Sequence, residues 1–328
     1  MQVVKFSRND ILIDTSKVTA GYWSGGLGTL VPRNEATFIT SSLSATQKDY
    51  YVNILYNSED HFSALYGHNG GSGSTVGAIN AGIGETQAIY NSYASYFLNT
   101  DDIDEGFKIQ STASLDKDIY ILVAERARMK DGMDAGSWTL ALSGSTSGAS
   151  TPVGKSKLTG SLRLFTDDSK VNVASTSPIG PRYIIRSGSA GTLNSSDTTR
   201  YGFFYPDAGT WIFSAAALSS SIPGTDTTSG STTDHNHRAS GFAPHLANDG
   251  TANNAQKLFV GMKVANQNQT FRNTEDQTDV TYFCRALANQ FNATSNPTFI
   301  SGSLGEYRHS SMEGNPQTFQ TTIALMSG

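Results

Sequence analysis

Two histidines, His235 and His237, have the spacing that most closely resembles a metal-binding motif in this sequence. Alternate residues of an extended segment point to the same side, so these two imidazoles could share one ion, with His245 as a third ligand. The surrounding residues 219–254 are polar and of low complexity. That length and composition are typical of a solvated surface loop, which does not fix its side chains in place. We therefore expect a loop here, with a metal site as the alternative.

Residues 154–156, Gly-Lys-Ser, match the end of a phosphate-binding loop motif but not its beginning. Ala149 stands where the motif has its first glycine, and Pro152 interrupts the loop. The motif must also open a helix, whose first amides hold the phosphate, whereas residues 158–165 have the pattern of a strand. The sequence therefore predicts no nucleotide cofactor.

The remaining catalytic motifs are incomplete or absent. The acidic residues at 101–105 lack the spacing of a calcium-binding loop, because Gly106 follows too soon and the required glutamate is missing. No Gly-x-Ser-x-Gly motif of a serine hydrolase occurs. Two carboxylates far apart in the chain could still form a glycosidase pair. We therefore predict a protein that is not an enzyme and has no cofactor, with a hydrolase as the least favoured alternative.

Arg126 and Arg128, followed by Lys130, form the one local basic patch, directly after the apolar run 119–124. Such a patch can contact the acidic surface of a partner protein. Salt bridges at the end of a strand are the favoured alternative, because short isolated patches rarely do more. Both arginines are candidate interface residues.

The composition excludes some classes of partner. The chain of 328 residues has a net charge of -5, and without clustered basic residues it has no electrostatic basis for binding nucleic acid. No apolar run approaches the roughly 20 residues that cross a bilayer, and the first residues lack a signal-peptide pattern. We expect a soluble protein made in a cytoplasm, without membrane insertion. The single cysteine, Cys284, is expected to be a small apolar side chain of a strand.

Alternation of apolar and polar residues predicts a mainly β fold. The clearest strands are residues 50–56, 62–66, 119–124 and 138–142. We expect β-sandwich-like domains with one or two short helices and long polar loops.

Three further segments have strong local signals. Residues 199–213 predict a hairpin of two aromatic strands around the reverse turn Pro-Asp-Ala-Gly at 206–209. Apolar residues at helical spacing predict a helix near 86–98 that lies on a sheet. Residues 258–262 predict a second, short helix.

The length favours two domains, because single cores rarely grow to this size. The Ser- and Gly-rich residues 143–150 gain nothing by burial. We therefore expect an N-terminal β-rich domain over 1–142, a flexible linker over 143–157, and a C-terminal β-rich domain over 158–328 with residues 219–254 inserted.

The last fifty residues indicate assembly. They predict two strands, 278–288 and 317–326, and a strand near a chain end offers unpaired backbone groups that another chain can complete. We expect four apolar side chains of the hairpin and the final strand to contact neighbouring proteins, namely Tyr205, Trp211, Phe319 and Ile323.

Several segments together resemble a family of virion structural proteins from contractile-tailed bacteriophages, especially the T4-like phages of marine bacteria and cyanobacteria. The matching segments are Ser-Leu-Ser-Ala-Thr-Gln-Lys-Asp-Tyr-Tyr-Val at 42–52, Tyr-Gly-His at 66–68, Ala-Ile-Tyr at 88–90, Glu-Arg-Ala-Arg-Met-Lys at 125–130, Tyr-Gly-Phe-Phe-Tyr-Pro-Asp-Ala-Gly at 201–209, Phe-Asn-Ala-Thr-Ser-Asn-Pro-Thr-Phe at 291–299 and Asn-Pro-Gln-Thr-Phe-Gln-Thr-Thr-Ile-Ala-Leu at 315–325. They follow one another in order along nearly the whole chain.

The resemblance implies a non-enzymatic tail or baseplate component, present in several copies per particle and bound to other virion proteins. It implies location in the virion after assembly in the host bacterial cytoplasm. It assigns no catalytic residue. A receptor- or glycan-binding module at the particle surface is the alternative, favoured by the tyrosine-rich strands and the long polar loop at 219–254.

Overall fold

The structure is a computed structural model, and it describes residues 6–31, 39–40, 51–71, 85–143, 162–218, 254–265, 267–285, 298–303, 305–314 and 324. The chain divides into two compact units. The larger unit is Lys17–Asp276, and the smaller unit combines Met1–Ser16 with Gln277–Gly328.

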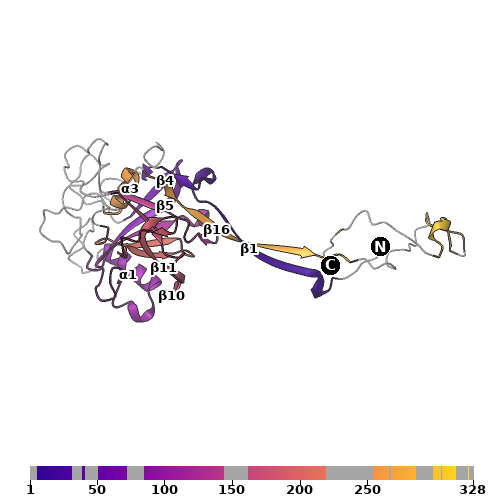
Figure 1. The fold of residues 1–328 in the computed structure, drawn as a ribbon, viewed down its shortest axis with the longest axis horizontal. Coiled ribbons are helices and arrows are strands. Elements are labelled where there is room, and N and C mark those ends of the chain that lie inside the picture. Colours follow the sequence, from indigo (N-terminus) through magenta and orange to yellow (C-terminus); the bar gives the residue numbers. More distant parts are fainter. Residues whose placement is uncertain are drawn as a thin grey trace. The chain divides into compact units, whose positions relative to one another are not determined.

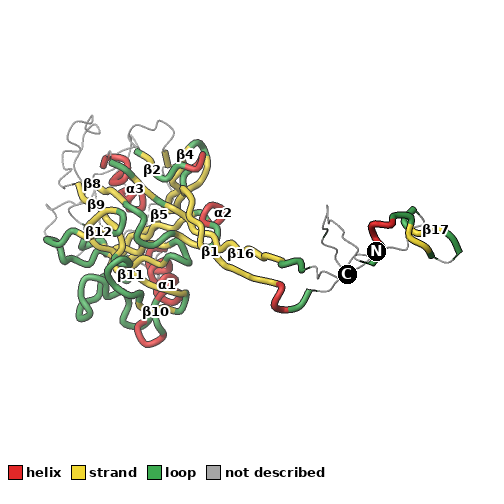
Figure 2. The backbone as a smooth tube through the Cα atoms, turned by 45° about the vertical axis from the view of Figure 1, so that its right-hand side comes forward, coloured by secondary structure: helices red, strands yellow, loops and turns green. Residues whose placement is uncertain are grey.

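The larger unit is built on one 11-stranded antiparallel sheet, which confirms the mainly β fold (Figures 1 and 2). Nine of its strands follow one another across the sheet in the order β3 (Ile39–Thr40), β4 (Tyr51–Tyr56), β5 (Glu59–His68), β6 (Asp118–Ala124), β14 (Thr210–Ser214), β13 (Gly202–Tyr205), β11 (Gly180–Ser189), β9 (Leu162–Asp167) and β8 (Leu140–Ser143). The other two, β10 (Ser175–Ser177) and β12 (Thr192–Leu193), pair with β11.

The sheet joins the two segments that the sequence assigned to separate domains. Strand β6 pairs with β14, where Ile121 lies opposite Ile212, and β8 pairs with β9, where Leu140 lies opposite Phe165. The structure therefore divides between the larger and smaller units instead of at 143–157. The physical reason is that the aromatic hairpin of β13 and β14 completes its hydrogen bonding with a strand about 90 residues earlier in the chain.

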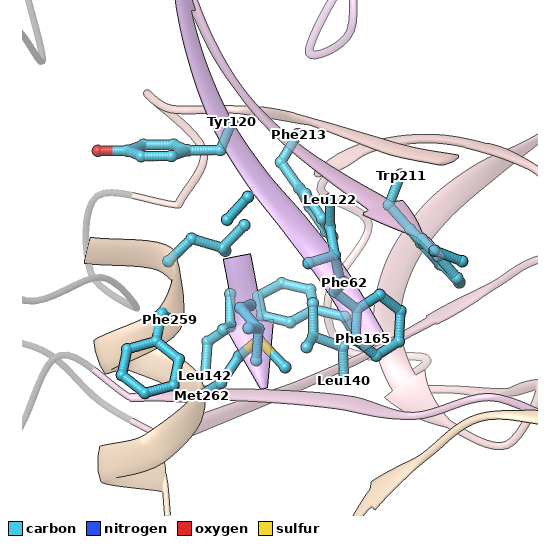
Figure 3. Close-up of a cluster of buried hydrophobic side chains, with 14 of the residues drawn as sticks. Phe62, Tyr120, Leu122, Leu140, Leu142, Phe165, Trp211, Phe213, Phe259 and Met262 are labelled. Atoms are coloured by element: carbon cyan, nitrogen blue, oxygen red, sulfur yellow. The ribbon is translucent and has the colours of Figure 1, made fainter. Parts of the chain in front are cut away.

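The two faces of the sheet bury separate hydrophobic cores. Successive residues of β6 alternate between them, so Leu122 packs in one core and Ile121 in the other. Helix α3 (Asn254–Ala265) covers the first core with Phe259 and Met262, as Figure 3 shows. Helix α1 (Glu85–Phe97) covers the second core. Both faces are thus closed, so the strands of the larger unit are largely buried.

The local predictions for this unit are confirmed. Helix α1 matches the helix expected near 86–98, and α3 contains the expected short helix at 258–262. Strands β13 and β14 form the predicted hairpin. The remaining short elements of the unit are η2 (Ser24–Gly26), β2 (Thr29–Leu30), η4 (Thr100–Asp102), α2 (Arg126–Met129), β7 (Gly132–Met133) and β15 (Gln269–Thr270).

The smaller unit contains few regular elements among its described residues. It begins with η1 (Arg8–Asp10) and includes the first half of β1 (Ile11–Gly21) and the second half of β16 (Arg272–Tyr282). It also has a short pair of strands, β17 (Ile300–Ser301) and β18 (Glu306–Tyr307), and a final turn, η5 (Ser310–Met312). The predicted strand 278–288 is therefore present up to Tyr282. Most of 317–326 lies outside the described residues.

Candidate interaction surface

The smaller unit carries an exposed two-stranded ribbon, which we define as residues 11–16 of β1 and 277–282 of β16. The two strands are neighbours in a sheet. All twelve residues of the ribbon are exposed. Strand β16 meets β7 only at Asn273 and Thr274, outside the ribbon. Among the described residues, therefore, no third strand or helix covers the ribbon.

One side of the ribbon is apolar. The Phe283 amide donates to the Asp10 carbonyl at 2.8 Å, and antiparallel pairing continued from this bond sets Tyr282 opposite Ile11 and Val280 opposite Ile13. Residues directly opposite each other point to the same side of a sheet. Ile13, Val280 and Tyr282 are 64%, 44% and 42% exposed. We call these four side chains, Ile11, Ile13, Val280 and Tyr282, the apolar face.

Polar contacts fix the end of the ribbon. The Asp10 carboxylate accepts hydrogen bonds from the Ser7 amide (2.9 Å) and the Ser7 hydroxyl (2.6 Å), and it lies 2.9 Å from the Arg285 guanidinium. The Ser7 hydrogen bonds chiefly, and the Arg285 charge secondarily, lower the pKa of Asp10. The Phe6 ring packs on Tyr282 with centroids 5.3 Å apart. The chain at this end is therefore shaped by specific contacts.

An exposed ribbon of this kind is poorly stable by itself. Two-stranded antiparallel pairs are at best marginally stable in water, and three or more strands or a covering element are usually needed. No other described strand pairs with its outer edges, so their amides and carbonyls can bond to another chain. Apolar side chains gathered on one exposed side are also typical of interaction sites. The ribbon can therefore act chemically as a docking element, through backbone hydrogen bonds and apolar burial.

A second constellation, in the larger unit, has residue types that serine hydrolases use. The Ser24 hydroxyl oxygen lies 3.0 Å from Nε2 of His61, and Nδ1 of His61 lies 2.8 Å from the Glu59 carbonyl oxygen. Ser24 and His61 are buried, and burial lowers the pKa of His61. Although 37 residues separate them, the strand β5 brings His61 to the turn that contains Ser24.

The hydrogen bonds of this constellation hold two segments of the fold together. The Ser24 amide donates to Nε2 of His61 at 3.0 Å, so this nitrogen is an acceptor and the proton lies on Nδ1, facing the Glu59 carbonyl. The Ser24 hydroxyl donates to the Glu59 carboxylate. The imidazole therefore joins the turn at Ser24 to the start of β5, and its basic nitrogen is already occupied.

The predicted basic patch is divided between two roles. Arg128 donates from Nε to the Asp60 carbonyl at 2.9 Å and forms a salt bridge with Glu59. This is the strand-end salt bridge that the sequence favoured. Arg126 is exposed and has no hydrogen bond or ion pair with another described residue. Arg126 alone thus remains available to a partner.

Two candidate interface residues are buried. Tyr205 and Trp211 are 1% and 0% exposed, and they lie in the middle of the 11-stranded sheet. Tyr205 packs against Phe97 of α1, and Trp211 stacks on Phe204. They are therefore core residues, because their hairpin has further strands on both sides and core on both faces.

The other predicted site residues are not brought together by the described structure. Phe319, Ile323, His235 and His237 lie outside the described residues. Cys284, expected inside a strand, follows the end of β16 and is exposed. Across the described ranges, no group of three or more His, Cys, Asp or Glu side chains is arranged to hold a metal ion.

A shallow groove of about 750 Å³ lies at the β9, β11 and β12 end of the larger unit. Most of the residues that line it are of polar types, with Ser187, Asn194 and Thr199 beside the pair Arg163 and Asp197, whose charged atoms are 2.7 Å apart. The groove therefore offers hydroxyl, amide and charged groups to a polar ligand.

The apolar face was not predicted from the sequence, although a signal for part of it was present. Ile11 and Ile13 are β-branched and lie two positions apart, the spacing at which side chains of a strand share one side. Their pairing with Val280 and Tyr282 joins residues almost 270 positions apart, which no local pattern indicates.

Comparison with known proteins places the chain in no established family. No protein-family model, no curated protein and no solved structure matches it. Within the described part of the chain, no helix has the length and apolar composition that crossing a membrane requires.

Proposed function

We propose that this protein is a structural subunit that joins neighbouring proteins in a larger assembly, and that the assembly is the tail of a contractile bacteriophage. The exposed ribbon is the observation that carries this proposal. It combines an apolar face with strand edges that pair with no further described strand. Covering either of them with another chain lowers the free energy.

Repetition strengthens such contacts. A single ribbon buries few side chains, so one contact is expected to be weak. In a symmetric particle each subunit makes the same contact, and simultaneous contacts raise the overall affinity far above that of one. Several copies per particle therefore suit a subunit of this kind.

The phage assignment is supported by the ordered resemblance to tail and baseplate proteins of T4-like phages. The baseplate or tail end is the proposed position, with other virion proteins as partners and assembly in the host cytoplasm. No catalytic residue takes part in the proposed role.

Two measurements test the proposal. Mass spectrometry of purified particles is expected to detect this chain in several copies. Size-exclusion chromatography of the isolated protein mixed with candidate tail proteins is expected to show a complex that a chain lacking residues 1–16 does not form. A protein that is absent from particles and stays monomeric with every tail protein would refute the proposal.

The polar groove favours a second candidate, a receptor- or glycan-binding module. Its hydroxyl and amide groups, with the pair Arg163 and Asp197, suit hydrogen bonding to a sugar. A glycan array is the direct test. Binding that is lost in Asp197→Asn and kept in Asp279→Asn, a substitution in the ribbon, would support the glycan role over the scaffold role.

A further inference from the structure

Two arginines of the larger unit lie against the ring of Phe203 in β13, and a third lies on the same strand as one of them. The Arg182 guanidinium carbon lies 4.5 Å from the Phe203 ring centroid, and that of Arg200 lies 5.9 Å from it. Arg186 lies four residues after Arg182 in β11, on the same side of the strand. Arg182, Arg186 and Arg200 are all partly buried, and we call them the arginine cluster.

The arginine cluster has no direct ionic partner among the described residues. None of the three forms an ion pair with a described carboxylate. The Nε atoms of Arg186 and Arg200 are buried and have no hydrogen-bond partner in the described part of the chain. Arg186 reaches only the Asp197 carbonyl, at 3.5 Å. Burial, with repulsion from Arg182 and Arg186, lowers the pKa of Arg200, and attraction from Asp168 and Asp116 offsets only part of this effect.

The two carboxylates whose charges act on Arg200 are already committed to other donors. Asp116 accepts hydrogen bonds from the Ile109 amide at 2.7 Å and from the Ser214 hydroxyl. Asp168 accepts from the Ile184 amide at 2.9 Å and from the Asn172 side chain at 2.8 Å. These carboxylates therefore hold loops and strands in place and leave the guanidinium groups without a direct anionic partner.

A partly buried cation without a partner destabilises a fold, because desolvation is not offset by an opposite charge. Three of them close together add mutual repulsion. We infer that Arg182, Arg186 and Arg200 form a binding site for an oxyanion, that is, a phosphate or carboxylate group. Guanidinium groups bind both through charge-assisted hydrogen bonds in a planar fork.

This inference does not depend on the proposed function, since the site lies in the larger unit and uses no residue of the ribbon. The chemistry also separates it from the groove, whose arginine is paired with Asp197. The arginine cluster differs because none of its arginines forms an ion pair with a described carboxylate.

Isothermal titration calorimetry of the whole chain with inorganic phosphate, and separately with acetate, tests the site at constant ionic strength. Binding of at least one of the two anions is expected. Arg200→Gln is expected to weaken that binding by about tenfold or more, the effect of losing one charge-assisted hydrogen bond. The matched control, Arg126→Gln, removes the same charge from an exposed arginine and is expected to keep wild-type affinity.

Thermal unfolding supplies a second readout. In chloride alone, Arg200→Gln is expected to melt no lower than wild type, because it removes a repelled cation. In phosphate or acetate the wild type is expected to gain stability and the variant to gain much less. If Arg200→Gln does not fold, Arg186→Gln is measured in its place with the same expected results. Failure of both anions to bind, or equal loss of binding in Arg126→Gln, would overturn the inference.

Discussion

Ile13 is the residue whose substitution most directly separates docking from folding. Its side chain is 64% exposed in the ribbon, so little of it supports the isolated subunit. Ile13→Ser is therefore expected to change the free energy of unfolding by no more than about 0.5 kcal/mol, as for other surface sites.

The expected loss of docking is larger. Full burial of an isoleucine side chain is worth about 1.5–3 kcal/mol. The 64% still exposed can therefore contribute about 1–2 kcal/mol when a neighbour covers it. That free energy corresponds to roughly a fivefold to thirtyfold weaker contact for the serine variant.

Competition during assembly is the assay. Wild type and Ile13→Ser are produced together in equal amounts, and their ratio in purified particles is measured by quantitative mass spectrometry. The variant is expected to be under-represented about fivefold or more. Val173→Ser is the matched control, because Val173 is 95% exposed and belongs to the larger unit. Equal incorporation of Ile13→Ser and wild type would refute the docking role of the apolar face.

Two further predictions concern the larger unit. Because burial lowers the pKa of His61, the unfolded chain takes up its proton more readily, and stability is expected to fall as the pH drops below about 6.5. His61→Gln should flatten the melting temperature between pH 7 and 5, whereas His309→Gln, at an exposed site, should not. A Cβ at Gly202 would lie 2.3 Å from the Ile212 carbonyl oxygen, so Gly202→Ala is expected to cost about 1–3 kcal/mol in urea unfolding. Gly28→Ala, where nothing lies within 4 Å, should leave the urea midpoint nearly unchanged.

Local patterns in the sequence were sufficient for the elements that depend on neighbouring residues. The hairpin of β13 and β14 was predicted because Pro206 and Gly209 set the turn between aromatic strands. Helix α1 was predicted because its apolar residues recur at helical spacing.

Those local patterns could not predict which distant strands pair with one another. The polar residues at 143–157 suggested a domain boundary, yet β6 and β14 pair across them, so the hairpin lies at the centre of one sheet. Tyr205 and Trp211 were consequently expected at a surface and are buried. The residue pattern of an aromatic strand does not show whether one face of its sheet is covered or both.

The candidate sites also depend on strand pairing that was not predicted from the sequence. Arg182 and Arg200 approach one aromatic ring only because β11 and β13 are antiparallel neighbours. The apolar face likewise needs β1 beside β16. The spacing of these arginines and apolar residues along the sequence does not predict that they lie close together in the fold.

A density map of the particle, at a resolution that traces side chains, tests the central claim most directly. We expect this chain in several copies, with another chain lying against Ile13 and Val280 of each ribbon. A particle in which the ribbon faces solvent on both sides, or one that lacks the chain, would contradict the claim.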